Sequence, residues 1–496
     1  MLRASPAAWR VLALLASLCL VATACSDSSS QSSKPTAVGQ PGSRPNIVFI
    51  LTDDLSMNLV PYMPHVQALA NSGTTFRNYF VVDSLCCPSR TAIFTGQYPH
   101  NNGIFTNVGA DGGYAGYNRF GDARKSFAIA LHAAGYRTGI MGKYLNGYES
   151  QFTPAAGWDT WDVAGNGYPE YKYWLNENGK QVYYGAKPKD YLNTVLTQKA
   201  SQFIQGAHSA GKPFALEVAT FIPHLPWVPA PQDVGTFPTL GAPRGPAFDH
   251  TPANAPNWLK QLPPLSAADI KSLDVAFRRR VEAVQSVDRM IAQLEQLLAK
   301  TGELRNTYFV FSSDNGFHHG EYRMLLGKTT AFDTDIKVPL VVTGPGVPAG
   351  HTVAALASSI DLAPTFLTIA GAKPTDRPDG VSLLPLLHGA RPPTTWQTTV
   401  LIEHHGPAID PRDPDRQSSR WGNPPSYEAM RATDFLYVEY VTGEREYYDL
   451  RRDPSELNNL APKLSAVRLQ ALHKQLMSLE RCHGAAACQR AAAPVG

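Results

Sequence analysis

The sequence has 496 residues, of which 43% are hydrophobic, and its formal net charge is +3 at pH 7. A chain of this length and apolar share can bury a sizeable core and suits one large domain with a smaller one. The small net charge, with no block of like charges, argues against nucleic acid as a partner.

The first 25 residues have the layout of an export signal. Arg3 and Arg10 precede an apolar run over residues 11–22, which is too short to predict a permanent membrane span. Two interpretations of its end stay open. Small residues before Cys25 fit cleavage by a signal peptidase, whereas the run VATAC followed by serines resembles a bacterial lipobox that places a lipid on Cys25. Both predict an exported protein, which is either a cell-surface lipoprotein held to the membrane by that lipid or a secreted or periplasmic protein.

Residues 26–43 are rich in serine, glycine and proline and indicate a flexible linker. Beyond it, continuous apolar runs are typical of parallel strands that are buried on both faces. These runs are PNIVFILTDD, RTGIMGKY, FALEVAT, TYFVFSSDNG and VPLVVTG. Helical patterns lie between them, such as residues 269–300. Residues 44–390 are therefore predicted to form an α/β domain, with a large, mostly parallel sheet sandwiched by helices.

The character of the sequence changes after residue 390. The runs TTVLIEHH, YEAMRAT, FLYVEYV and REYYDLR are short and separated by turn residues, which predicts an antiparallel sheet of about four strands. A helix is expected over residues 463–480. Residues 391–496 are therefore predicted to form a smaller α+β subdomain. Cys482 and Cys488 are spaced so that a disulfide could join them in an oxidising compartment.

Polar side chains follow three of the predicted parallel strands. Asp53 and Asp54 end the first strand, Asp314 and Asn315 end another, and Lys143 ends a third. In open α/β sheets, ligands bind at the carboxyl ends of the strands. Adjacent carboxylates repel each other unless a cation lies between them, and two pairs of oxygen side chains suit calcium or magnesium.

Two of the six cysteines, Cys86 and Cys87, stand side by side in the run LCCPSRTAIFTG. Two buried thiols in the core would be one explanation. The run also resembles the signature of type I sulfatases, which belong to the alkaline phosphatase superfamily: Cys-x-Pro-Ser-Arg, then four residues and Thr-Gly. Counting back from Pro88 makes Cys86 the signature cysteine and leaves Cys87 at the variable position.

The resemblance extends over nearly the whole chain beyond the linker. The runs PNIVFILTDD, TGQYPHNNGI, GKYLNGY, PHLPW, SSDNGFHHGE, IKVPLVVTGPG, DLAPTFLTIAG and YYDLRRDPSELNNLA occur in the order of the family. GKYLNGY and DNGFHHGEYR are more similar to the N-acetylglucosamine-6-sulfatase and heparan endosulfatase branch than to simple arylsulfatases. The resemblance implies a sulfuric ester hydrolase that releases sulfate from a sulfated carbohydrate or an aryl sulfate.

The resemblance also implies a modified residue and a metal ion. In the family a maturation enzyme oxidises the signature cysteine, here Cys86, to Cα-formylglycine. The hydrate of that aldehyde attacks sulfur with one hydroxyl and expels sulfate through the other. One divalent cation is expected, calcium with magnesium as the open alternative, on Asp53, Asp54, Asp314 and Asn315 together with the modified residue.

Four further roles are implied residue by residue. Arg90, one helical turn after Cys86, would stabilise the hydrate. Lys143 and Lys328 would bind sulfate oxygens as charge develops on them. His224, in the run PHLP, would protonate the leaving oxygen.

The chain departs from the family pattern two residues after Lys143. Many members have a histidine there, whereas this chain has Leu145. His318, with His319 beside it, is a candidate substitute.

Two alternative functions stay open from the sequence. Related enzymes of the superfamily hydrolyse phosphonate or phosphate esters with the same aldehyde. A lipoprotein with a decayed site would instead bind sulfated glycans without cutting them. The complete set of metal-ligand candidates, together with Cys86 and Arg90, argues against this non-catalytic binder.

Overall fold

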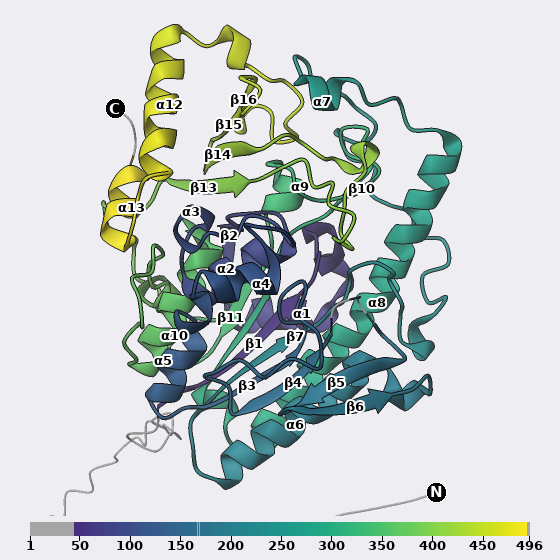
Figure 1. Ribbon diagram of the computed structural model, residues 1–496, viewed down its shortest axis with the longest axis vertical. Coiled ribbons are helices and arrows are strands. Elements are labelled where there is room, and N and C mark those ends of the chain that lie inside the picture. The colour runs from purple at the N-terminus through teal and green to yellow at the C-terminus, as the bar shows by residue number, and fades with distance from the viewer. Residues whose placement is uncertain (1–43, 166, 168, 494–496) are drawn as a thin grey trace, which may run out of the picture. The chain divides into compact units, whose positions relative to one another are not determined.

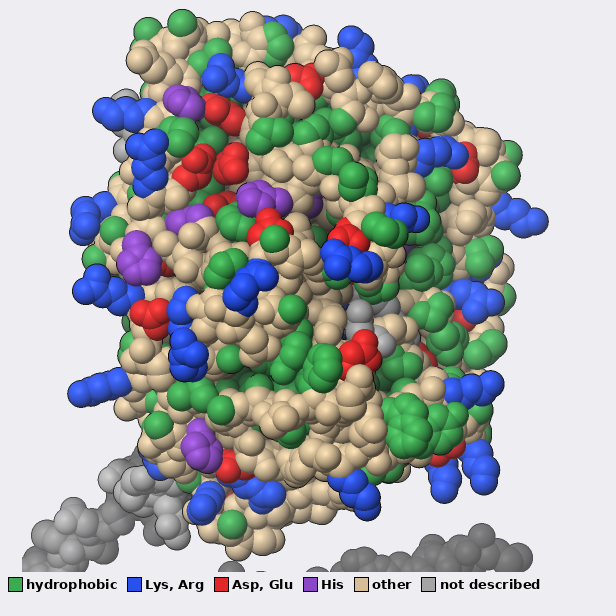
Figure 2. All heavy atoms as spheres, viewed as in Figure 1, with side chains coloured by type: hydrophobic (Ala, Val, Ile, Leu, Met, Phe, Trp, Pro, Cys, Tyr) green, Lys and Arg blue, Asp and Glu red, His purple; other side chains and the backbone are tan. Residues whose placement is uncertain are grey.

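The computed structural model describes residues 44–165, 167 and 169–493. The signal, lipid site and linker expected within residues 1–43 lie outside these residues. Within the described ranges, none of the helices combines the length and the apolar character that crossing a membrane requires. On the face shown in Figure 2, lysine and arginine side chains are interspersed with acidic ones, as the small net charge leads us to expect.

A ten-stranded sheet forms the larger part of the fold (Figure 1), in the order β12-β2-β11-β8-β1-β7-β3-β4-β5-β6. Its four central strands run parallel to one another. They are β8 (Thr307–Ser313), β1 (Asn46–Thr52), β7 (Phe214–Ala219) and β3 (Arg137–Gly142). The carboxyl ends of these strands therefore meet at one edge of the sheet.

The outer strands have mixed directions. On one side β11 (Leu340–Thr343) is antiparallel to both β8 and β2 (Thr74–Phe80), and β12 (His351–Ser358) is parallel to β2. On the other side β4 (Thr160–Ala164) is parallel to β3, and β5 (Tyr173–Glu177) and β6 (Lys180–Tyr184) continue antiparallel. The predicted mostly parallel sheet is confirmed, although the run VPLVVTG forms the antiparallel strand β11.

Helices cover both faces of this sheet, because side chains of its strands alternate between two apolar faces. Along β1, Ile47, Phe49 and Leu51 belong to one buried cluster, whereas Val48 and Ile50 belong to the other. The first cluster includes side chains of α2 (Cys86–Thr95), α5 (Phe127–Ala133) and α10 (Leu362–Ala370). The second includes side chains of α1 (Pro64–Ser72), α6 (Leu192–Ser209) and α8 (Ala267–Lys300).

Short elements occupy the connections between these strands and helices. They are α3 (Pro99–Asn102), α4 (Gly113–Arg119), α7 (Asn257–Lys260), β9 (His318–His319), β10 (Leu326–Gly327), α9 (Asp333–Ile336) and α11 (Leu384–Leu387). Strands β9 and β10 pair with each other and hold the segment that follows β8.

A second sheet of four antiparallel strands lies at the top of Figure 1. Its strands are β13 (Thr399–His404), β14 (Tyr427–Ala432), β15 (Phe435–Tyr440) and β16 (Arg445–Asp449). Helices α12 (Ala466–Leu479) and α13 (Ala485–Ala491) follow, and a disulfide joins Cys482 to Cys488. The predicted four-stranded sheet, C-terminal helix and disulfide are confirmed.

The two sheets share one buried core. Val400, Leu401 and Ile402 of β13 belong to the same hydrophobic cluster as Ile47 of β1. The C-terminal sheet therefore packs on the larger part of the fold through apolar contacts. The domain boundary at residue 390 stays a prediction.

Candidate active site

Five predicted site residues lie at the carboxyl edge of the central strands. Asp53 and Asp54 follow β1, Asp314 and Asn315 follow β8, and Lys143 follows β3. The Asp54 amide donates to Asp314 Oδ1 at 3.1 Å, and Asn315 Nδ2 donates to Asp54 Oδ1 at 2.7 Å. All five side chains are buried. The parallel strands thus bring the two polar pairs together, as predicted from their positions at the carboxyl ends of the strands.

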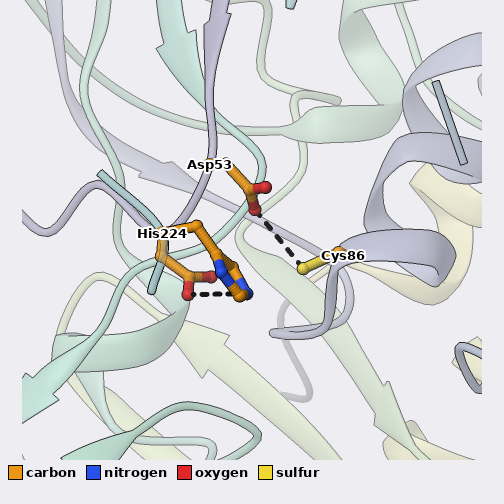
Figure 3. Close-up of side chains that lie close together, drawn as sticks. Asp53, Cys86 and His224 are labelled. Atoms are coloured by element: carbon orange, nitrogen blue, oxygen red, sulfur yellow. Dashed lines mark hydrogen bonds and ion pairs between the residues drawn. The ribbon is translucent and has the colours of Figure 1, made fainter. Parts of the chain in front are cut away.

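Cys86 begins α2 and lies against this cluster. Its Sγ is 3.4 Å from Asp53 Oδ1 and 2.7 Å from Lys328 Nζ. Figure 3 shows the side chains of Asp53 and Cys86 directed toward each other, with His224 beside them. Cys87, in contrast, belongs to the hydrophobic cluster that contains Ile47 and α10, where burial raises its thiol pKa to about 12. The two neighbouring cysteines therefore have opposite environments, one charged and one apolar.

Three carboxylates of the site are each paired with a basic side chain. The pairs are Lys143 Nζ with Asp53 Oδ2 at 2.5 Å, Lys328 Nζ with Asp54 Oδ1 at 2.7 Å, and Arg90 Nε with Asp314 Oδ2 at 2.8 Å. Burial alone would raise the pKa of Asp53, but the charges of Lys143 and His224 lower it well below its usual range. Burial and the charge of Asp53 raise the pKa of Asp314 to about 6. The buried acids thus compete for the positive charge available.

The oxygen atoms of this cluster fit a hard divalent cation. Asn315 Oδ1 is buried and accepts no hydrogen bond from any described residue, although its own amide touches Asp54. Ligand atoms of Asp53, Asp54, Cys86 and His224 all lie within 4.8 Å of one another. Carboxylate and amide oxygens are the donors that calcium and magnesium take in proteins. The buried cluster of acids could therefore hold a metal ion.

His224 follows β7 and faces the acidic cluster. Its Nδ1 lies 2.7 Å from the carbonyl oxygen of Leu225, and its Nε2 lies 2.7 Å from Asp415 Oδ1 and 3.5 Å from Asp54 Oδ2. Burial alone would lower the pKa of His224, but the charges of Asp415 and Asp54 raise it. These carboxylates therefore favour the protonated imidazolium, which can give up a proton.

Asp415 is a site residue that the sequence did not reveal. It lies in residues 405–426, which connect β13 to β14 and are called the β13–β14 loop below. Its Oδ2 is 3.4 Å from Cys86 Sγ and 3.5 Å from Lys328 Nζ. The surrounding run DPRDPDRQ has the composition of an ordinary exposed turn. Its place in the site depends on long-range packing that no local pattern encodes.

Arg280 of α8 also escaped prediction, and it supports the turn that carries Asp54. Its guanidinium donates to the Asp54 carbonyl oxygen and, at 2.8 Å, to His319 Nε2, and it lies over the ring of Phe317. Burial lowers the pKa of Arg280 to about 9. Asp54 has a φ of 63°, in the left-handed region that non-glycine residues rarely adopt, so this turn needs such support.

His318 lies outside the cluster around Cys86. It is in β9, where its Nδ1 is 3.0 Å from the Asp335 carboxylate and its Nε2 is 3.1 Å from the carbonyl oxygen of Trp421. Leu145, at the position where many family members have histidine, is part of the hydrophobic core. The structure thus gives His318 structural partners and does not bring it to the predicted metal ligands.

Comparison with known proteins identifies the family. The sequence model of the Sulfatase family matches residues 45–372. A second family model, described as N-sulphoglucosamine sulphohydrolase, C-terminal, matches residues 320–482. Human N-acetylglucosamine-6-sulfatase is 34% identical over 477 residues, which cover 89% of this chain and 85% of that protein. A putative extracellular sulfatase Sulf-1 homolog of Caenorhabditis elegans is 35% identical over 387 residues, which cover 75% of this chain and 54% of that protein.

A solved structure has the same fold. BT4656, determined in complex with its substrate D-glucosamine-2-N,6-O-disulfate, superposes with a TM-score of 0.74 at 24% sequence identity, over 88% of this chain and 98% of that chain. The family model and the relatives together span most of the described residues, including both sheets. The chain therefore belongs to the sulfatase family, the hydrolases of sulfuric esters.

Proposed function

We propose that this sulfatase depends on formylglycine and removes the 6-sulfate from glucosamine or N-acetylglucosamine units of a sulfated glycan. The observation that carries the first part is the position of Cys86, whose Sγ meets Asp53 and Lys328 while Cys87 is in the apolar core. The substrate class is supported by the name of the human relative and by the disulfated glucosamine that BT4656 binds.

The metal would be held by Asp53, Asp54, Asp314, Asn315 and the oxygen of the modified residue 86. We propose calcium, with magnesium as the alternative, because the ligand set contains oxygen donors only. Such an ion would supply positive charge that favours ionisation of a nearby hydroxyl.

The chain's own side chains would bind the sulfate and move the protons. A hydrated aldehyde at position 86 would offer one hydroxyl to attack sulfur and a second whose deprotonation releases sulfate. Arg90 would hold that hydrate in place from the next turn of α2. Lys143 and Lys328 would neutralise the sulfate oxygens, and His224 would protonate the oxygen that leaves with the sugar.

The decisive experiment combines a mass measurement with a substrate panel. Protein from its native host, or made together with a formylglycine-generating enzyme, should show a peptide across Cys86 about 18 Da lighter than the free thiol form. The same protein should release sulfate from 6-sulfated N-acetylglucosamine and from an aryl sulfate. Active protein with an unmodified Cys86 would refute the proposal, and preference for an aryl phosphonate would favour the phosphonate hydrolase alternative.

We also infer that the chain is exported. The signal-like residues 1–25 and the name of the nematode relative, an extracellular sulfatase, support this inference. A fatty-acid label tests whether Cys25 carries a lipid. The lipoprotein would take up the label and a Cys25→Ser variant would not, whereas a secreted protein would appear unlabelled in the medium.

A further inference from the structure

The β13–β14 loop brings a carboxylate to the reacting position of the site. Asp415 Oδ2 lies 3.4 Å from Cys86 Sγ. In a productive complex the atom under attack must come within about 3–3.5 Å of the nucleophile. Asp415 Oδ2 therefore lies at the distance from the residue 86 side chain at which the sulfur of a substrate has to be placed.

Lys328, which the proposed function assigns to sulfate, surrounds this carboxylate together with three further donors. His224 Nε2 is 2.7 Å from Oδ1, and Lys328 Nζ is 3.5 Å from Oδ2. Asn107 and Asn146 donate their side-chain amides to Oδ2 at 3.2 and 3.3 Å. Two cations and two amide donors make an anion site, and a carboxylate fills it with the same type of charge-assisted hydrogen bond as a sulfate oxygen.

Little space remains beside the carboxylate. The cavity next to Asp54, His224 and Lys328 has a volume of about 30 Å³, and Asp415 and Trp421 of the β13–β14 loop form part of its wall. This volume admits about two water molecules, since each needs roughly 10–15 Å³. A sulfated sugar cannot enter until part of the wall moves.

The β13–β14 loop is suited to such a movement. Antiparallel neighbours are usually joined by a few residues, and much longer connections in compact domains tend to be functional. The base of the loop is fixed, because the Gly406 amide donates to Ser426 Oγ at 3.0 Å and the Ala408 amide donates to Asn423 Oδ1 at 2.8 Å. Residues 409–417, which include Asp415, lie between these fixed points.

We propose that the β13–β14 loop is an autoinhibitory strap whose Asp415 carboxylate occupies the sulfate site until an anionic substrate displaces it. This inference rests on the proposed function, because it assumes that the site takes sulfate esters. The exchange replaces one anion by another at the same donors, so the positive groups stay neutralised. A neutral sugar offers them no such replacement and leaves the strap closed.

The first test is the affinity for inorganic sulfate, measured by calorimetry on metal-loaded protein. Asp415→Ala removes the competing anion and should bind sulfate about tenfold more tightly or better. In the wild type most molecules are in the closed state, which lowers the apparent affinity for sulfate, and the variant lacks that closed state. Asp415→Asn should fall between the two. Asp410→Asn is the matched control, since Asp410 pairs with Arg412 within the same loop, at 2.6 Å. Unchanged or weaker sulfate binding by Asp415→Ala would overturn the strap and make Asp415 a substrate-binding or structural residue.

A second test uses the wild-type protein and does not depend on the folding of a variant. Amide hydrogen exchange in residues 409–417 should become faster when sulfate saturates the site, because the strap is released. Slower or unchanged exchange there would overturn the inference. Sulfate-ester turnover, followed in parallel, keeps the two proposals apart. Protein with a modified residue 86 that cleaves no sulfate ester refutes the proposed function, whereas the binding and exchange data decide the strap.

Discussion

His100 should make the stability of the protein depend on pH between 6 and 9. It lies in α3, and its Nδ1 is 2.9 Å from Glu403 of β13 while its Nε2 is 2.9 Å from the carbonyl oxygen of Cys482. The pair thus joins the first half of the chain to the C-terminal sheet. Burial alone would lower the pKa of His100, but the hydrogen bond and charge of Glu403 raise it to about 8.

The size of the effect follows from the difference between the folded and unfolded pKa values. An unfolded histidine has a pKa of about 6.5, so the difference is roughly 1.5 units, or about 2 kcal/mol at 1.36 kcal/mol per unit. Because the folded value is the higher one, this stabilisation is complete below about pH 6.5. It is lost as the pH rises through 8.

The assay is urea unfolding of the wild type and of His100→Gln at pH 6 and pH 9.5, with the disulfide left oxidised. The free energy of unfolding of the wild type should exceed that of the variant by about 2 kcal/mol more at pH 6 than at pH 9.5. Other titrating groups cancel in this comparison. If both proteins show the same change between the two pH values, the His100–Glu403 pair does not stabilise the fold through charge, and the reasoning fails.

Other predictions concern the proposed site. Cys86→Ala should abolish sulfate release and the mass change of the peptide, whereas Cys87→Ser, outside the charged cluster, should keep much of the turnover measured on an aryl sulfate. Chelation should remove activity, and calcium or magnesium should restore it; restoration by zinc alone would contradict an all-oxygen ligand set. Asp314→Ala should lose bound metal in elemental analysis and should be destabilised in a melting curve by about 3–5 kcal/mol, because Arg90 is left buried without its partner. His224→Ala should slow sulfated-sugar turnover by about 10²–10⁴-fold while affecting nitrophenyl sulfate much less, since nitrophenolate leaves without a proton; equal losses on both would reassign His224 to sulfate binding.

The large sheet and most of the acidic cluster were predictable because they depend on short-range patterns. Continuous apolar runs mark strands covered on both faces, and parallel strands bring their carboxyl ends to one edge. Asp53 and Asp314 could therefore be placed together although they are far apart in sequence. The direction of the strand beside β8 was not predictable, since the run VPLVVTG is equally apolar whether it runs parallel or, as β11 does, antiparallel.

Arg280 and Asp415, which the sequence did not predict, lie in elements whose local sequence pattern indicates a different role. Arg280 falls on the buried face of α8, where helical periodicity predicts an apolar residue. Asp415 is carried by a loop whose composition predicts only a turn. For His318 and His319 the sequence suggested a role in the site that their contacts in the structure do not support. They are adjacent in a short strand, so their side chains point to opposite faces, one toward Asp335 and the other toward Arg280.

The burial of α2 limits when the proposed conversion of Cys86 could take place. All ten residues from Cys86 to Thr95 are buried in the folded chain. An enzyme that oxidises this cysteine has to reach its side chain, and the folded protein keeps Cys86 buried. The proposed conversion of Cys86 must therefore be finished while the nascent chain is still unfolded. A molecule that folds first would keep the Cys86 thiol and stay inactive. Oxidation of Cys86 would therefore have to be faster than folding.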